Sequence, residues 1–368
     1  MTQTATDRAL NFSAGPATLP EPVLEQARTD IWDIADSGIG ICEHSHRGPV
    51  FDNVINEAVS DCREVGSIPD DYEILFLQGG ATLQFAMLAM NFLKEGSVAD
   101  YLDTGVWTSK AIKEAKKIGN VNVAFDGSTT KYDHCPSDEE LELSQSAAYL
   151  HYCSNNTIYG TRYENVPTTN APVICDMSSD IFSRSIDWSK HAMVYAGAQK
   201  NLGPSGTVLV VIRKSLLEQC DGTLPLMLDY QAQASKGSML NTPPTFGIYL
   251  MGQVFKWILN AGGLQAIEER NETKASIIYG ALADCSDFYS LIARDDCRSR
   301  MNISFRCQTP ELDALFLEKA ATHRMSGLKG HRSVGGLRAS VYNAFPVEGC
   351  EKFAAFLTEF ANDHACKS

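Results

Sequence analysis

The sequence predicts an α/β fold, with a large domain built on a mostly parallel, mixed sheet flanked by helices and a smaller C-terminal α/β domain. Three observations support this prediction. Short apolar stretches alternate with helical ones between residues 70 and 213, as in strand–helix–strand units. Residues 206–212 are mostly β-branched, as expected for a strand covered on both faces. The length of 368 residues suits two domains.

The elements of the large domain are predicted from hydrophobic runs and the residues that interrupt them. An apolar strand at 72–77 ends at Gly79 and Gly80, and an apolar helix follows at 82–93. A helix at 246–260 follows a pair of prolines and ends at a pair of glycines. The other strands are predicted just before 103 and at 147–153, 172–175, 193–195 and 206–212.

The smaller domain is predicted from an amphipathic helix at 264–284 onward, which divides the chain into residues 1–264 and 265–368. Residues 1–15 are assigned to the large domain in this division, but the prediction allows them to pack against the smaller domain. Two strands at 301–305 and 337–342 and a last helix at 348–364 complete the predicted elements.

The charge balance excludes several classes of partner. The chain has 45 acidic and 31 Lys plus Arg residues, for a net charge of −14. This balance argues against nucleic acid and anionic membranes as partners. A small anionic ligand is still allowed, because it needs only a local cluster of Arg and His.

The cysteines and the N-terminus indicate a cytoplasmic protein. Eleven cysteines are spread along the chain without a C-x-x-C pair, which favours reduced thiols over a disulfide scaffold or a metal site. Residues 1–11 are polar and do not resemble a signal peptide. No apolar run is long enough to predict a membrane span.

Three loop segments follow predicted strands and carry candidate functional residues. Gln78–Gly79–Gly80–Ala81–Thr82 joins a strand to a helix, where backbone N–H groups can cradle a phosphate; the alternative is a simple tight turn. Asp176 ends a buried strand, where open α/β sheets bind ligands, or else it caps the next helix. Lys200 follows a strand of small apolar residues; burial there would make its amine nucleophilic, whereas the alternative is a solvated loop lysine.

Together, these residues are the set that pyridoxal phosphate requires. The cofactor needs a lysine for its aldehyde, a carboxylate for its ring nitrogen and a cradle for its phosphate. Trp107 follows another predicted strand and would stack on the ring, unless it only packs in the core.

Seven motifs, taken in order, resemble those of the phosphoserine aminotransferases, a class V family of fold type I pyridoxal-phosphate enzymes. The resemblance covers nearly the whole chain. Its motifs are N-F-S-A-G-P at 11–16, S-H-R-G at 45–48, L-Q-G-G at 77–80, T-G-V-W at 104–107, A-G-A-Q-K-N at 196–201, N-T-P-P-T at 241–245 and G-H-R-S-V-G-G-L-R-A-S at 330–340.

The resemblance implies a role for each matching residue. Lys200 would bond covalently to the cofactor, and Asp176 would pair with its ring nitrogen. Trp107 would stack on the ring, and Thr157 would bind its oxygen. The cofactor phosphate would be held by Ala81, Thr82 and Gln199, and by Asn241 and Thr242 of a second subunit, which implies a homodimer with shared sites.

The resemblance also implies the substrates. Arg338 would hold the substrate α-carboxylate, with His46, Arg47, His331 and Arg332 around the phosphate or distal carboxylate. Bidentate arginine suits such anions. Alternatively, Arg47 and Arg332 form surface ion pairs and both histidines are structural. Thr82 stands where many relatives have arginine, and Asn156 and Tyr159 also depart from the usual residues.

The implied reaction is reversible transamination between 3-phosphohydroxypyruvate plus glutamate and phosphoserine plus 2-oxoglutarate, in serine biosynthesis. A 4-phosphohydroxythreonine step in vitamin B6 synthesis is a second implied activity. Two alternatives stay open. The first is another class V enzyme, such as an alanine– or serine–glyoxylate aminotransferase. The second is a binding protein whose lysine has lost its role, although Asp176, Trp107 and Lys200 together argue against it.

Overall fold

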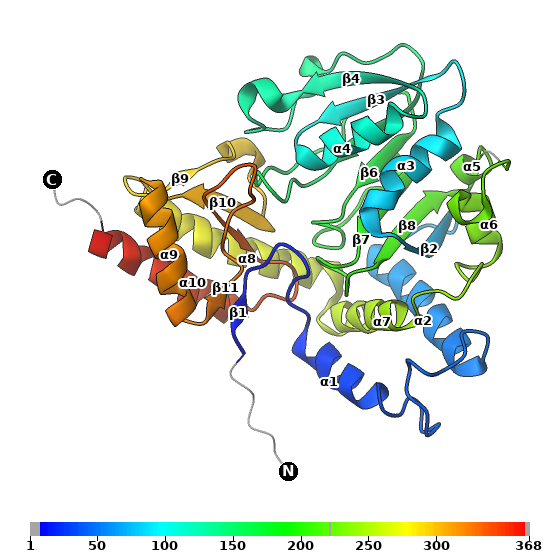
Figure 1. The fold of residues 1–368 in the computed structure, drawn as a ribbon, viewed down its shortest axis with the longest axis horizontal. Helices are drawn as coiled ribbons and strands as arrows, with labels where there is room; N and C mark the ends of the chain where they lie inside the picture. The colour runs from blue at the N-terminus through cyan, green and yellow to red at the C-terminus, as the bar shows by residue number, and fades with distance from the viewer. Residues whose placement is uncertain (1–7, 221, 365–368) are drawn as a thin grey trace.

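The computed structural model describes residues 8–220 and 222–364 (Figure 1). Most of the polar N-terminal stretch considered above, and Cys366, lie outside these residues. In the described part of the chain, no helix is both long and apolar enough to cross a membrane.

A seven-stranded sheet forms the centre of the large domain, in the order β2-β8-β7-β6-β5-β3-β4. All neighbouring strands are parallel except β8, which runs antiparallel to both β2 and β7. The strands are β2 (Tyr72–Gln78), β3 (Val98–Asp103), β4 (Asn120–Asp126), β5 (Ala147–Cys153), β6 (Val173–Asp176), β7 (Met193–Gly197) and β8 (Thr207–Arg213). The predicted α/β class with a mostly parallel, mixed sheet is therefore confirmed.

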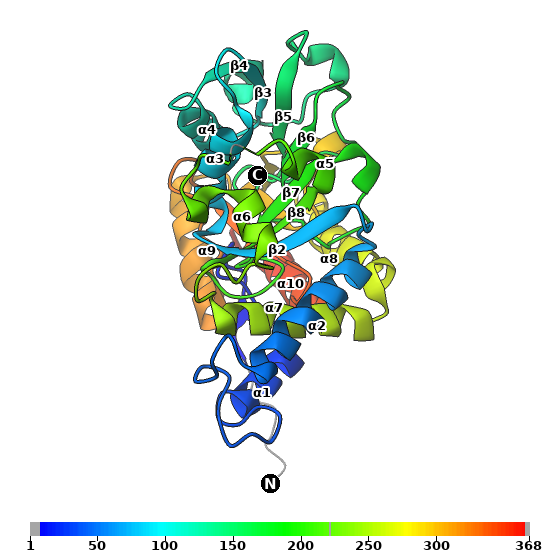
Figure 2. The same ribbon diagram turned by 90° about the vertical axis from the view of Figure 1, so that its right-hand side faces the viewer.

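Helices cover both faces of this sheet, because its strands are apolar on both sides. Alternate residues of β2 enter different cores: Ile74 and Phe76 pack on one face, and Leu75 and Leu77 on the other. The first face carries α2 (Pro49–Gly66) and α7 (Thr245–Asn260), and the second carries α3 (Gly80–Phe92) and α4 (Val106–Ala115) (Figure 2). Shorter helices are α1 (Glu21–Asp30), α5 (Lys214–Leu217) and α6 (Tyr230–Ser235).

A second, phenylalanine-rich core lies to one side of the large sheet (Figure 1). It is built on the antiparallel sheet β12-β10-β9 and on the short parallel pair β1-β11. The strands are β1 (Leu10–Asn11), β9 (Ser290–Leu291), β10 (Asn302–Arg306), β11 (Met325–Ser326) and β12 (Leu337–Ser340). The helices are α8 (Gly263–Asp284), α9 (Pro310–Thr322) and α10 (Val347–His364).

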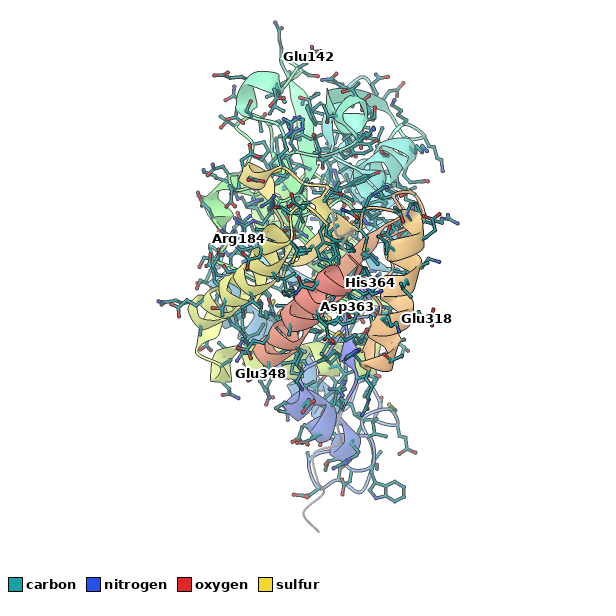
Figure 3. The ribbon with its side chains drawn as sticks, turned by 90° about the vertical axis from the view of Figure 1, so that its left-hand side faces the viewer. Glu142, Arg184, Glu318, Glu348, Asp363 and His364 are labelled. Carbon is teal, nitrogen blue, oxygen red and sulfur yellow. The ribbon has the colours of Figure 1, made fainter. Side chains whose placement is uncertain are left out.

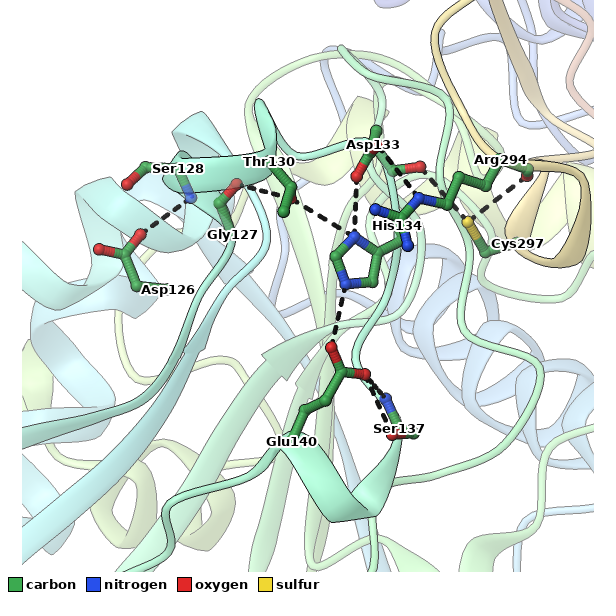
Figure 4. A network of polar contacts seen from close by, with 10 residues as sticks. All are labelled: Asp126, Gly127, Ser128, Thr130, Asp133, His134, Ser137, Glu140, Arg294 and Cys297. Carbon is green, nitrogen blue, oxygen red and sulfur yellow. Dashed lines mark hydrogen bonds and ion pairs between the residues drawn. The ribbon is translucent and has the colours of Figure 1, made fainter.

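Polar contacts link the domain of the large sheet to the part of the chain that builds the smaller sheet (Figure 4). Arg294 Nε donates to Asp133 Oδ2 at 3.1 Å, and the Arg294 backbone N–H donates to the Asp133 carbonyl at 2.9 Å. The Cys297 thiol donates to the same carbonyl at 3.6 Å. These bonds join the loop after β4 to the segment after β9.

Candidate active site

A cavity of about 210 Å³ lies where the parallel strands of the large sheet end. Its position agrees with the rule that open α/β sheets bind ligands beyond the carboxyl ends of their strands. Seven of the predicted site residues line it: Ala81, Thr82, Trp107, Thr157, Asp176, Gln199 and Lys200. These residues come from separate segments of the chain, which the parallel strand order brings to one edge of the sheet.

Asp176 is the last residue of β6 and is almost fully buried, with 4% of its surface exposed. Its Oδ1 accepts hydrogen bonds from the Ser178 backbone N–H at 2.9 Å and from Ser178 Oγ at 2.6 Å. Burial raises the pKa of the Asp176 carboxyl, and the Ser178 hydrogen bonds and nearby Lys200 oppose this shift. A buried carboxylate held in this way is suited to pair with a protonated ring nitrogen.

Lys200 follows β7, and its ammonium faces the same cavity. Its Nζ donates a hydrogen bond to Thr157 Oγ1 at 2.6 Å and lies 5.8 Å from the centre of the Trp107 ring. Burial lowers the pKa of Lys200, while the Asp176 carboxylate opposes that shift. A lower pKa leaves more of the amine unprotonated, which is the form that attacks a carbonyl carbon.

The turn between β2 and α3 forms an anion cradle at one end of the cavity. Ala81 and Thr82 lie in the first turn of α3, where backbone N–H groups have no partner within the helix. Gly197 faces this turn, and a Cβ atom there would lie 3.6 Å from the Ala81 nitrogen. A side chain at this position would therefore narrow the cradle, which fits a site that must admit a phosphate.

Trp107 lies in the first turn of α4, on the wall of the cavity. Lys110 Nζ lies 4.5 Å from the centre of its ring. The buried Trp107 Nε1 has no hydrogen-bond partner in the described part of the chain. An indole beside an open cavity, close to Asp176 and Lys200, is suited to stack on a flat ligand ring.

Arg338, on β12, brings a cation from the smaller sheet to this site. One of its terminal nitrogens donates to the Thr157 carbonyl at 3.2 Å, and its buried Nε has no partner among the described residues. Burial lowers the pKa of His331, and the positive charges of Arg338 and Arg332 lower it further. The two arginines thus disfavour a proton on His331, and an anionic substrate would offset their positive charges.

Seven predicted site residues do not line this cavity: Arg338, His331 and Arg332, described above, and four that are expected at the site of a second subunit, His46, Arg47, Asn241 and Thr242. His46 and Arg47 lie in the loop between α1 and α2, and Arg47 is exposed. Asn241 accepts a hydrogen bond from Gln78 Nε2 at 3.0 Å. Their expected roles at the site of a second subunit stay predictions.

The sequence interpretation gave no role to Ser178, although this residue also lines the cavity. Its hydroxyl donates to Asp176 and accepts from the Gly197 backbone N–H at 3.0 Å. The signal was present in the sequence, because a serine two residues after an aspartate commonly returns a hydrogen bond to it.

The fold and the site together define a transferase of the kind that uses pyridoxal phosphate. Comparisons with known proteins agree, since the aminotransferase class-V family model matches residues 9–353. The chain belongs to the class-V aminotransferases. Curated phosphoserine aminotransferases are 46% and 50% identical to it over nearly its whole length, so within that class it belongs to the phosphoserine aminotransferase family.

Three relatives illustrate how far this similarity extends. The phosphoserine aminotransferase of Desulfotalea psychrophila is 50% identical over 355 residues, or 96% of this chain and 98% of that protein. The chloroplastic phosphoserine aminotransferase 1 of Arabidopsis thaliana is 46% identical over 98% of this chain and 84% of its own. The solved phosphoserine aminotransferase from Bacillus circulans subsp. alkalophilus has a TM-score of 0.96 and 47% identity, covering 98% of this chain and 100% of that one.

Proposed function

We propose that this chain transfers the amino group of glutamate to 3-phosphohydroxypyruvate, reversibly, forming phosphoserine and 2-oxoglutarate. The observation that carries the proposal is the cluster of Arg338, His331 and Arg332 beside Lys200 and Asp176, in a chain that matches phosphoserine aminotransferases over nearly its full length. The chemically similar 4-phosphohydroxythreonine is proposed as a second product.

Pyridoxal phosphate is the proposed cofactor, and a solved phosphoserine aminotransferase from Trichomonas vaginalis contains it. When bound, it supplies an electron sink for the carbon that loses a proton. Asp176 would hold the ring nitrogen, and Trp107 would cover the ring. Thr157 would bind the ring oxygen. The phosphate would be held by Ala81, Thr82 and Gln199, and by Asn241 and Thr242 of the second subunit.

Lys200 would bond to the cofactor and then move the proton. Its lowered pKa allows a free amine to take the proton from the substrate Cα atom and return it on the cofactor side. The hydrogen bond from Lys200 Nζ to Thr157 Oγ1 holds the amine in the cavity. One group therefore acts as both base and acid.

The charges around the cavity support two anionic substrates. Arg338 would hold the α-carboxylate that glutamate and phosphoserine share. His331 and Arg332, with His46 and Arg47 of the second subunit, would hold the phosphate or the distal carboxylate. A glyoxylate aminotransferase gains no comparable support, because an alanine–glyoxylate enzyme from Nostoc is only 16% identical and shows the fold alone.

A homodimer is proposed because exposed apolar side chains flank both segments expected to reach a second subunit. Trp32 is 84% exposed, and Ile31 and Ile39 lie near it, before His46 and Arg47. Leu226 and Met227 are also exposed, shortly before Asn241.

The ten cysteines in the described residues are free thiols, which supports a cytoplasmic location.

The substitution Lys200→Ala tests the proposed function. After incubation with pyridoxal phosphate, the wild-type protein should absorb visible light, lose that absorbance with glutamate and regain it with 3-phosphohydroxypyruvate. The variant should do none of these, because it lacks the amine that bonds to the cofactor. Spectra of the purified proteins provide the measurement.

The exposed Lys117, which pairs with Glu114, provides the matched control, and Lys117→Ala should behave as wild type. A colourless wild-type protein would refute the cofactor assignment. Equal turnover of serine and phosphoserine would refute the substrate assignment.

A further inference from the structure

Three consecutive backbone carbonyls, five to seven residues after Asp176, each accept a hydrogen bond from a different asparagine side chain. Phe182, the middle residue, has a φ of 53°, which is in the left-handed region. The bonds run from Asn201 Nδ2 to the Ile181 carbonyl at 3.1 Å, from Asn343 Nδ2 to the Phe182 carbonyl at 2.8 Å and from Asn271 Nδ2 to the Ser183 carbonyl at 3.1 Å.

These asparagines, Asn201, Asn271 and Asn343, are called the asparagine triad below. They also bond to one another. The Asn343 backbone N–H donates to Asn201 Oδ1 at 3.0 Å, and Asn271 Nδ2 donates to Asn343 Oδ1 at 2.8 Å. Their exposed fractions are 6%, 2% and 1%, so water does not compete for these bonds.

The triad joins the segments that carry three active-site residues. The accepting carbonyls belong to the loop that continues from Asp176, and Asn201 directly follows Lys200. Asn343 lies three residues beyond the end of β12, which carries Arg338. These segments come from separate parts of the chain and meet in one bonded network.

Helix α8 anchors the network from the side of the smaller core. It contributes Asn271 and, one turn later on the same face, Lys274. Lys274 Nζ donates to the Val341 carbonyl at 2.9 Å and to the Tyr342 carbonyl at 2.6 Å. The backbone that leads from Arg338 to Asn343 is thus held on both sides.

We propose that the asparagine triad consists of positioning residues, which fix Lys200 and Arg338 relative to Asp176. The proposal rests on the proposed function, in which Lys200 moves the proton and Arg338 binds the substrate carboxylate. Loss of a triad side chain leaves buried carbonyl or amide groups without a partner, and the backbone must shift to satisfy them. Small shifts of reacting groups strongly affect the rate.

Substitution of Asn201 and substitution of Asn343 should have different effects on the kinetic constants. Asn201→Ala acts on Lys200, so kcat should fall about tenfold while KM for glutamate stays within about twofold. The pH midpoint of the visible absorbance of the holoenzyme should also shift. Asn343→Ala acts on the Arg338 strand, so KM for glutamate should rise about tenfold with a smaller change in kcat and an unshifted midpoint.

Asn91 provides a matched control, because it is fully buried on α3 and donates to the Met87 and Leu228 carbonyls at 2.7 and 2.8 Å. Asn91→Ala should lower the unfolding temperature but leave kcat, KM and the absorbance midpoint unchanged. If Asn343→Ala does not fold, Asn343→Ser, which keeps a short donor, takes its place.

The outcomes separate this inference from the proposed function. Triad variants that match Asn91→Ala, or that change kcat and KM in equal proportion with an unshifted midpoint, would overturn the positioning role. A wild-type protein without visible absorbance or glutamate turnover would instead refute the function itself.

Discussion

Lys200 and Lys274 both have lowered pKa values, but their surroundings give them different tasks. Lys200 faces a cavity with a carboxylate close by, whereas Lys274 is fully buried between two backbone carbonyls. Burial lowers the pKa of Lys274 to about 7; Cys350 opposes this shift and Arg270 adds to it. A neutral amine still has two N–H donors, so both hydrogen bonds survive deprotonation.

The Lys274 pKa predicts how stability changes with pH. Between about pH 7 and 10 the unfolded chain binds a proton that the folded protein does not, so stability rises with pH. The wild-type free energy of unfolding, relative to that of Lys274→Met, should therefore increase by up to about 1.4 kcal/mol per pH unit. Urea unfolding at about pH 7, 8 and 9 measures this difference.

Lys256→Met removes a lysine of the partly exposed pair with Glu57 and controls for the loss of charge alone. The contrary outcome is that the free energy of unfolding of the wild type, relative to that of Lys274→Met, stays constant or decreases as the pH rises. That result would show that the buried amine is charged in the folded protein.

At the scale of elements, the turn from β2 into α3 shapes the anion cradle. Gly79 has a φ of 86°, and a Cβ atom there would lie 2.8 Å from Leu83 Cβ. Both facts demand glycine, because a side chain would strain the backbone and also push on the first turn of the helix. The turn therefore sets the direction in which the Ala81 and Thr82 N–H groups point.

Gly79→Ala should weaken binding of pyridoxal phosphate by about tenfold, because the first turn of α3 must move away from its cradle position. Spectroscopic titration of the apoprotein with the cofactor measures this change. Gly96, shortly after the same helix, has a φ of 80° but open space around its Cβ position. Gly96→Ala should destabilise the protein and leave cofactor affinity unchanged; equal loss in both variants would contradict this account.

At the scale of the whole molecule, charged side chains are distributed unevenly. Exposed acidic side chains such as Glu142, Glu318, Glu348 and Asp363 lie over the face drawn in Figure 3. The cations Arg338 and Arg332 lie beside His331 at the site instead. The net charge of −14 therefore describes the solvated surface and not the substrate pocket.

Mixed dimers test whether the site is shared between subunits. Lys200→Ala and Arg47→Ala homodimers should each lose most of their activity. In a mixed dimer, one site would combine the Lys200 of one chain with the Arg47 of the other and regain about half of the wild-type turnover. Co-expression with two affinity tags and steady-state assay provides the measurement. If both residues act within their own chain, the mixed dimer stays inactive.

Local patterns predicted most elements of the described fold. The strands 147–153 and 206–212 were recognised from apolar and β-branched runs, and β5 and β8 occupy these positions within one residue. The strand predicted at 337–342 ends at Ser340, because the next residues turn to join the asparagine triad. The short pair β1-β11 had no local signal, since its two residues per strand depend on a partner over 300 positions away.

The sequence by itself determined the class of fold, the family and the residue types of the site, because periodicity and motif order are local properties of the chain. Only the tertiary structure decided that Asn201 and Asn343 meet at residues 181–183. A hydrogen bond depends on distances of about 3 Å between groups far apart in the chain. Such distances are set when the sheets and helices pack together.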